Sequence, residues 1–231
     1  MLFRSAIDVS LSMETKDMDE NRTRLEIVKS VVKEFISKRE GDRLGIVIFG
    51  RYAVRQCPST SDHDSLQILL DQIQLRDIEG DKTAIGAGLA ISCLALERST
   101  CKTKIVLLLT DGINNISEIP VNQSVALAKG MNIRVYCIGV GTQSPIHFGD
   151  GNMDLDENML KNIAKETHGK YFYAGNTDML QSVYHAVDIL EKSKYEVKTR
   201  FTDSFYEWYV LLALIFLIGR FIVISWLAPI P

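Results

Sequence analysis

A short, uninterrupted apolar stretch in the middle of the chain sets the strongest limit on its fold. Residues 104–110 are Lys-Ile-Val-Leu-Leu-Leu-Thr, with five aliphatic residues in a row. A strand with one face in water alternates apolar and polar side chains, whereas a strand covered on both faces is apolar throughout. This stretch therefore predicts a central strand of a sheet that carries helices on both faces.

Strand-like and helix-like segments alternate around this stretch. A capping box at Thr23–Glu26 predicts the start of a helix that ends near Lys38. Further strands are expected before Asp8 and at 44–49, 52–57, 133–140 and 171–174, and further helices at 62–73, 83–96, 121–129, 157–167 and 177–192. Such alternation predicts an α/β fold, Rossmann-like, with a mostly parallel sheet and helices on both faces. Residues 52–57 are expected to form its antiparallel edge.

Charge and cysteine content argue against some functional classes. The formal net charge is −3, from 26 Lys and Arg against 29 Asp and Glu, and long basic runs are absent. Nucleic-acid binding requires a basic face or stripe, so we expect no nucleic-acid partner. The four cysteines show neither a C-x-x-C spacing nor a zinc-like pairing with histidine. Free structural thiols are the simplest interpretation, and they suit a domain that faces the cytosol.

The C-terminal segment has the length and apolarity of a membrane-spanning helix. From Tyr209 to Leu227 there are 19 residues, and only Gly219, Arg220 and Ser225 are neither apolar nor aromatic. About 20 such residues cross the hydrocarbon core as a helix, whereas helices buried in a protein core are usually shorter. Arg220 would cost roughly 2.5–3.5 kcal/mol at the centre of a span. It lies off centre, where snorkelling reduces that cost.

The sequence thus predicts three parts and an orientation. The parts are a globular domain in residues 1–192, a juxtamembrane linker in 193–207 and a transmembrane helix in 208–227. Lys and Arg residues precede the helix at 192, 194, 198 and 200, and none follows Arg220. The positive-inside rule then favours a cytoplasmic domain. Acidic residues are interspersed among the basic ones, so the preference is modest and the periplasmic side stays open.

Three short polar motifs follow or adjoin the predicted strands. Asp8-Val9-Ser10-Leu11-Ser12 follows the first strand, Asp81-Lys82-Thr83 opens the helix at 83–96, and Leu109-Thr110-Asp111-Gly112 closes the central strand. Ligands of parallel α/β sheets bind outside the carboxyl ends of the strands. The motifs therefore point to one site at that edge of the sheet.

Taken together, these motifs resemble the metal-ion-dependent adhesion site of von Willebrand factor A (VWA) domains, which integrin I domains also contain. The resemblance extends to the bacterial aerotolerance (Bat-type, BatA-like) membrane proteins. It rests on Arg24-Leu25-Glu26, Gly41-Asp42-Arg43-Leu44-Gly45, Thr83-Ala84-Ile85-Gly86, Leu108-Leu109-Thr110-Asp111-Gly112 and Ile138-Gly139-Val140-Gly141-Thr142. It covers nearly the whole chain and implies a VWA-type fold in a bacterial plasma membrane protein.

The resemblance implies five metal ligands. Ser10, Ser12 and Thr83 would offer hydroxyl oxygens, and Asp8 and Asp111 would bind directly or through water. Oxygen ligands suit hard cations, and Mg²⁺ keeps waters and uses few carboxylates, so Mg²⁺ is expected first, with Mn²⁺ or Ca²⁺ as substitutes. An Asp or Glu of a protein partner would complete the metal's coordination. The competing interpretation is that these residues only cap helices and form turns.

Two other site types fit the sequence poorly. Residues 150–154 begin like an EF-hand loop, but Leu155 stands at the sixth position and Lys161 at the twelfth. Phosphatases of the haloacid dehalogenase type need a second carboxylate two residues after the first, and here that residue is Ser10. We therefore expect a binding protein and not an enzyme.

Three functions remain in view. The first is a membrane-tethered module for cation-dependent protein–protein interaction in a Bat-type, aerotolerance-related complex. The second is a regulatory or adaptor subunit of a MoxR-type AAA+ ATPase or chelatase-like machine. The third is a structural membrane protein with a vestigial metal site. The resemblance implies other Bat-like proteins as further partners, which is analogy from the fold family.

The beginning of the chain departs from the family pattern. Relatives have hydrophobic segments ahead of the first strand, and here that strand follows Met1 directly. Arg4 and Ser5 also lie where a central strand should be apolar on both faces. We expect from this that upstream segments are missing, that the first strand is short, and that the site around Asp8 is weakened.

Overall fold

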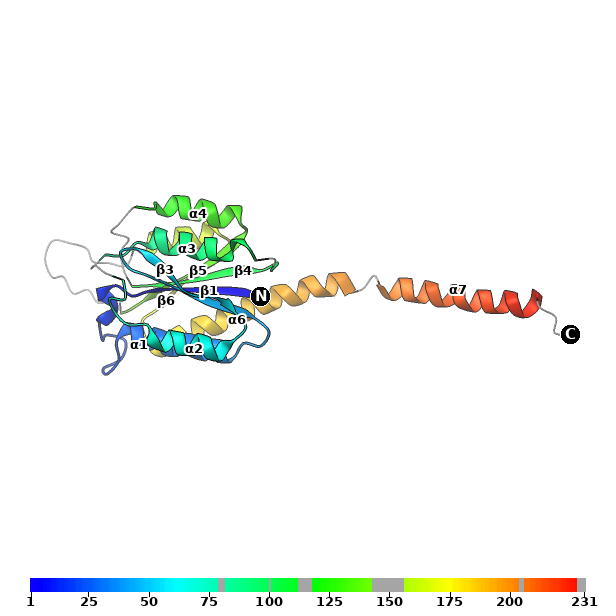
Figure 1. Cartoon of the computed structure of the whole chain (residues 1–231), viewed down its shortest axis with the longest axis horizontal. Coiled ribbons are helices and arrows are strands. Elements are labelled where there is room, and N and C mark those ends of the chain that lie inside the picture. The colour runs from blue at the N-terminus through cyan, green and yellow to red at the C-terminus, as the bar shows by residue number, and fades with distance from the viewer. Residues whose placement is uncertain (79–81, 100, 112–117, 143–155, 204–205, 228–231) are drawn as a thin grey trace. The chain divides into compact units, whose positions relative to one another are not determined.

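A computed structural model describes the chain except for residues 79–81, 100, 112–117, 143–155, 204–205 and 228–231 (Figure 1). For residues 192–203, 206–208, 219 and 221–227 it describes the backbone alone. The chain divides into two compact units, Met1–Tyr184 and His185–Pro231.

The first unit is built on a sheet with the strand order β3-β2-β1-β4-β5-β6. The strands are β1 (Leu2–Asp8), β2 (Arg43–Phe49), β3 (Ala53–Thr60), β4 (Lys104–Thr110), β5 (Ile133–Val140) and β6 (Tyr171–Ala174). Neighbouring strands run parallel except for β2 and β3, which are antiparallel. The predicted mostly parallel sheet with an antiparallel edge strand is confirmed.

Helices cover both faces of this sheet, as the apolar character of β4 predicts. Leu107 and its neighbours in β4 have no exposed surface. Figure 1 shows α3 (Ile85–Glu97) and α4 (Val121–Gly130) on one side of the sheet and α1 (Arg24–Ser37) and α2 (His63–Gln72) on the other. Buried residues of α5 (Glu157–Glu166) join the core on the α3 side. On the other side, Phe35 of α1 packs against Phe3 of β1.

The capping box predicted for α1 is present. The backbone N–H of Thr23 donates to Glu26 Oε2 at 2.7 Å, and the backbone N–H of Glu26 donates to Thr23 Oγ1 at 3.2 Å. Two otherwise unsatisfied donors at the helix start are thereby paired. The helix begins at Arg24, directly after the N-cap residue Thr23.

The first strand is complete, so the expectation of a short β1 is wrong. β1 spans seven residues, as β4 does, and every one of them is buried. Arg4 fits into this interior because its guanidinium lies against Gly45 of β2, where a side chain would collide with it. It donates to the carbonyl oxygen of Cys57 and, at 2.7 Å, to Ser59 Oγ. Burial lowers the pKa of Arg4 to about 10.

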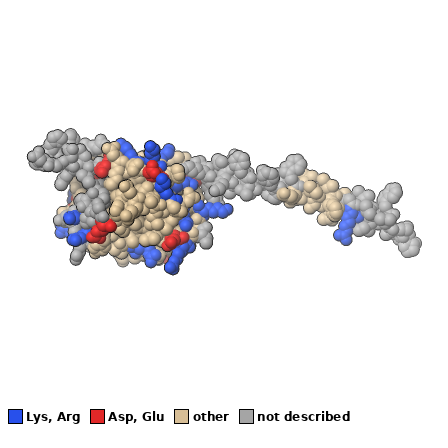
Figure 2. Space-filling model, turned by 90° about the horizontal axis from the view of Figure 1, so that it is seen from above, with Lys and Arg blue, Asp and Glu red and all other residues tan. Residues whose placement is uncertain are grey.

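The second unit is helical wherever the structure describes it. α6 (Thr177–Asp203) begins in the first unit and continues past residue 192, through most of the segment predicted as a linker. α7 (Tyr206–Leu227) covers the predicted transmembrane segment. Its described side chains are all exposed, and all of them except Arg220 are apolar or aromatic. Figure 2 shows basic residues blue and apolar ones tan. Within the described part of the chain, no helix meets the length and apolarity required of a membrane span. The transmembrane helix and the boundary at residue 192 stay predictions.

Candidate metal centre

Four of the five predicted site residues come from the ends of two neighbouring strands. Asp8 is the last residue of β1, and Ser10 and Ser12 lie in the turn that follows it, which includes the short 3-10 helix η1 (Leu11–Glu14). Asp111 directly follows β4. Because β1 and β4 pair in parallel, their carboxyl ends meet at one edge of the sheet. The chain geometry therefore brings four of the five residues together.

Hydrogen bonds join these four residues. Ser10 Oγ and Ser12 Oγ lie 3.1 Å apart, and Ser12 Oγ donates to Asp111 Oδ1 at 2.6 Å. The backbone N–H of Ser10 donates to Asp8 Oδ1 at 2.9 Å. Thr110, which was not among the predicted site residues, donates its hydroxyl to Asp8 Oδ2 at 2.6 Å. The oxygen atoms of the β1 turn and the β4 end thus form one cluster.

Thr83, the fifth predicted ligand, lies at the same edge of the sheet. It is 3% exposed and directly precedes Ala84, the N-cap of α3. The N–H of Ala84 donates to the carbonyl of Gly50 at 2.7 Å, and Phe49, beside Gly50, accepts from Val9 of the β1 turn at 2.9 Å. Backbone hydrogen bonds thus connect the segment that carries Thr83 to the end of β2, and the end of β2 to the turn after β1. Asp81 and Gly112 of the predicted motifs lie outside the described residues.

The cluster carries more negative charge than its burial favours. The side chains of Asp8 and Asp111 are both 0% exposed. Burial raises the pKa of Asp8 to about 7, and the nearby Asp111 adds to that rise. Burial also raises the pKa of Asp111, and hydrogen bonds from Ser12 and Arg24 offset only part of this. Two buried carboxylates at one edge require positive charge to remain ionised together.

Arg24 supplies one such charge, and sequence reasoning missed its role. Its Nη1 donates to Asp111 Oδ2 at 2.7 Å, while Nε and Nη2 donate to the two carboxylate oxygens of Asp17 at 2.8 and 2.6 Å. The motif Arg24-Leu25-Glu26 was noticeable only as part of the family resemblance. The signal that could have revealed its role is a basic residue at the first position of a helix, where the positive end of the helix dipole disfavours it.

A divalent cation fits this donor set. Carboxylate and hydroxyl oxygens are ligands for hard cations, and the cluster presents both types within one hydrogen-bonded group. The Arg24 guanidinium contacts only one of the two buried carboxylates, Asp111, so a further positive charge would reduce the cost of burying both. Among the described residues, no three His, Cys, Asp or Glu side chains lie together as a metal-binding group. A cation at this cluster would therefore need the hydroxyl oxygens as ligands besides the two carboxylates. The EF-hand-like segment at 150–155 lies outside the described residues.

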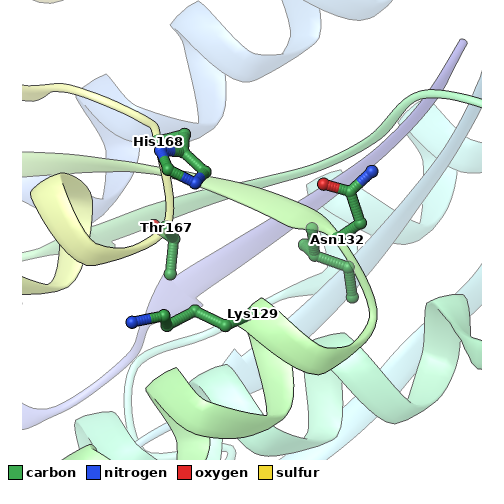
Figure 3. A pocket seen from close by; sticks show the side chains of 5 residues that line it. Lys129, Asn132, Thr167 and His168 are labelled. Atoms are coloured by element: carbon green, nitrogen blue, oxygen red, sulfur yellow. The ribbon is translucent and has the colours of Figure 1, made fainter.

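A small pocket lies at the opposite edge of the sheet, where β5 begins. Lys129, Asn132, Ile133, Thr167 and His168 line this pocket, which has a volume of about 140 Å³ (Figure 3). Asn132 and His168 follow the ends of α4 and α5 and have positive φ angles of 53° and 58°. Such residues commonly terminate helices. Helix ends thus account for the shape of this pocket.

Comparison with known proteins agrees with this architecture. The family model of the von Willebrand factor type A domain matches residues 5–186. An uncharacterized protein of Borreliella burgdorferi is 31% identical in an alignment 231 positions long, which covers 94% of this chain and 66% of that protein. The chain thus spans slightly less than two thirds of this relative's length.

Two solved structures extend the comparison. The crystal structure of an aerotolerance-related membrane protein from Bacteroides fragilis is 26% identical, covers 81% of this chain and 96% of its own, and has a TM-score of 0.66. Proximal thread matrix protein 1 from the mussel byssus was solved with a zinc-occupied MIDAS (metal-ion-dependent adhesion site) motif. It is 23% identical, the match covers 82% of this chain and 45% of the mussel chain, and the TM-score is 0.65. The predicted resemblance to VWA and aerotolerance-related proteins is confirmed, and the chain belongs to the von Willebrand factor type A domain family.

Proposed function

We propose that this chain is a membrane-anchored binding module that recognises a protein partner through a divalent cation. Asp8, Ser10, Ser12, Thr83 and Asp111 would hold the cation, with Mg²⁺ expected first. The observation that carries the proposal is the hydrogen-bonded cluster of Asp8, Ser10, Ser12 and Asp111 at the carboxyl edge of the sheet. The mussel protein, which has this fold, is described with a zinc-occupied MIDAS motif, and this supports a divalent cation as the ligand.

Each side chain has a separate role in this proposal. The hydroxyls of Ser10, Ser12 and Thr83 would face the cation as neutral ligands, and the two carboxylates would bind it directly or through water. The bond from Thr110 and the backbone N–H of Ser10 orient Asp8, so its carboxylate is held in place before any cation arrives. A cation held by few protein charges keeps a strong attraction for a further carboxylate, which an Asp or Glu of the partner would supply.

A binding role fits this site better than catalysis. A phosphatase of the haloacid dehalogenase type would need an acid two residues after Asp8, and Ser10 stands there with its hydroxyl bonded to Ser12. The apolar α7 and the similarity to a protein described as a membrane protein support a membrane anchor. The Bat-type complex, and the MoxR-type ATPase as the alternative partner, enter this proposal from the family resemblance alone.

Cation titration of the full chain in detergent tests the proposal. Calorimetry with Mg²⁺ and Mn²⁺ should reveal one site with a Kd at or below about 1 mM. Asp8→Asn and Asp111→Asn should each abolish it. Asp71→Asn is the matched control, since Asp71 is exposed on α2 and pairs with Lys33, so its loss should leave the affinity unchanged. Absence of binding by the wild type at several millimolar of either metal would contradict the proposal.

A further inference from the structure

Arg24 lies between two carboxylates and contacts both. One ion pair joins it to Asp111, whose side chain is fully buried, and the other joins it to Asp17 through both oxygens of that carboxylate. The Arg24 side chain is 14% exposed. Within the described part of the chain, Arg24 is the only basic side chain in an ion pair with Asp111. A position at the start of α1 is unfavourable for a cation, so these carboxylates account for its presence there.

The protein provides a shaped seat for this guanidinium. Gly141, which follows β5, has a φ of +121°, and a Cβ atom at this position would lie 2.6 Å from Arg24 Cζ and Nη2. Asp17 also accepts hydrogen bonds from the N–H and the hydroxyl of Thr142, both at 2.7 Å. Arg24 thus connects the turn after β1, the end of β4 and the end of β5.

The contacts of Asp111 determine what Arg24 does there. Ser12 Oγ donates to one oxygen of the Asp111 carboxylate and Arg24 to the other. A full positive charge therefore touches one of the two buried carboxylates that would bind a cation. Because like charges repel, that charge must also oppose the entry of a second cation next to Asp111. The ion pair between Arg24 and Asp111 thus stabilises the metal-free site, and the same ion pair weakens the attraction of the site for a metal ion.

We propose that Arg24 is a resident counter-cation that stabilises the metal-free site and sets its affinity for divalent cations. The part of this inference that concerns affinity rests on the proposed function, and the part that concerns stability does not. Asp17 is the positioning residue for Arg24: it fixes the guanidinium against Gly141 and Thr142 and neutralises part of its charge. The site thereby stays folded without metal. It also binds metal less tightly than it would if Arg24 did not contact Asp111.

A double-mutant cycle without metal tests the stability part. Thermal denaturation of the full chain in chelator would be compared for the wild type, Arg24→Met, Asp111→Asn and the double variant. Arg24→Met should lower the Tm by about 5–10 °C, because it leaves buried carboxylates uncompensated. The loss should be at most half as large in the Asp111→Asn background. Equal losses in both backgrounds would overturn the counter-cation role.

Cation titration tests the affinity part. Arg24→Met should bind Mn²⁺ about tenfold more tightly than the wild type, since a neighbouring charge changes ionic equilibria by at least that factor. Arg24→Lys keeps the charge and should bind as the wild type does. Arg22→Met is the matched control, because Arg22 pairs with Asp19 in the same loop and is 43% exposed, so neither its Tm nor its affinity should change.

The possible outcomes separate this inference from the proposed function. Binding by the wild type with weaker binding by Arg24→Met would overturn the inference alone, because Arg24 would then be needed to position Asp111. If neither the wild type nor Arg24→Met binds Mn²⁺, the proposed function and the affinity part both fail. The chelator cycle would still decide the stability part in that case.

Discussion

Arg4 is fully buried and Arg24 largely so, and the surroundings of the two arginines differ. Arg4 lies inside the sheet and donates to neutral oxygens, the Cys57 carbonyl and the Ser59 hydroxyl, and burial lowers its pKa to about 10. Arg24 lies at the carboxyl edge. Burial alone would lower its pKa, but hydrogen bonds to Asp17 and Asp111 hold the pKa above its usual value.

The difference separates a packing role from an electrostatic one. Arg4 fills the space over Gly45, and among the residues that the structure describes no carboxylate accepts a hydrogen bond from it to offset the burial of its charge. Arg24 faces excess negative charge that the fold has gathered at one edge. Substitutions at Arg4 should therefore change stability and leave cation binding alone, whereas substitutions around Arg24 should change both.

Truncation of Arg4 should have the largest effect. Arg4→Ala leaves a cavity over Gly45 and removes the donor to the buried Cys57 carbonyl, so we expect a loss of about 3–5 kcal/mol in the free energy of unfolding. Arg4→Met fills most of the space and should cost less than half of that. Urea denaturation measures both, with Arg98→Ala, an exposed arginine at the end of α3, as the control. A change in cation affinity at Arg4→Ala would break the distinction between the two arginines.

Gly141→Ala should disturb the seat of Arg24. The φ of +121° strains any other residue, and the new Cβ would displace the guanidinium, so we expect a loss of about 2–3 kcal/mol. Cation affinity should change as well, because Arg24 moves relative to Asp111. Gly130→Ala is the matched control: nothing lies within 4 Å of a Cβ there, and it should be neutral or slightly stabilising. Denaturation and Mn²⁺ titration of both variants give the measurement.

The central strand, the site residues and Arg4 show what can be predicted from the sequence and what cannot. Apolar runs such as 104–110 predict strands well, because a strand that is buried on both faces must be apolar at nearly every position. The four clustered site residues could be anticipated, because parallel strands end at one edge. Arg4, by contrast, led us to expect a short β1, because its acceptors at Cys57 and Ser59 lie more than 50 residues away and could not be recognised in the sequence. Contacts of this kind depend on strand register, which a single sequence does not specify.

Gly45→Ala should have a smaller effect, confined to the region of Arg4. Its Cβ would push the Arg4 guanidinium off its acceptors, at a cost of about 1–2 kcal/mol. In an Arg4→Met background that cost should largely vanish, because a flexible thioether can move aside. A double-mutant cycle by urea denaturation measures this coupling. Additive costs would mean that Gly45 is required for another reason, and the packing role of Arg4 would lose its support.

The smallest effect concerns pH and isolates the partner that holds Arg24. Burial would raise the pKa of Asp17, but hydrogen bonds from Arg24 and Thr142 hold it well below its usual value. A carboxylate with a depressed folded pKa contributes stability that is fully present above its unfolded pKa of about 3.9 and is lost as the pH falls further.

Asp17→Asn should therefore flatten the loss of stability below about pH 4. The stability that the wild type loses and Asp17→Asn does not should be about 0.5–1 kcal/mol, because water reaches this ion pair. Thermal melts of both proteins in chelator between about pH 2 and 6 measure this difference. Asp19→Asn is the control: Asp19 pairs with the exposed Arg22 and makes no contact with Arg24, so both variants should show a small change in slope. Only Asp17→Asn should also alter cation affinity at neutral pH, because only Asp17 offsets the charge that faces Asp111. Equal affinities for the two variants would mean that Asp17 only connects Arg24 to Thr142 and has no effect on the cation site. Arg24 would then be the one residue of this pair that affects the charge at the carboxyl edge.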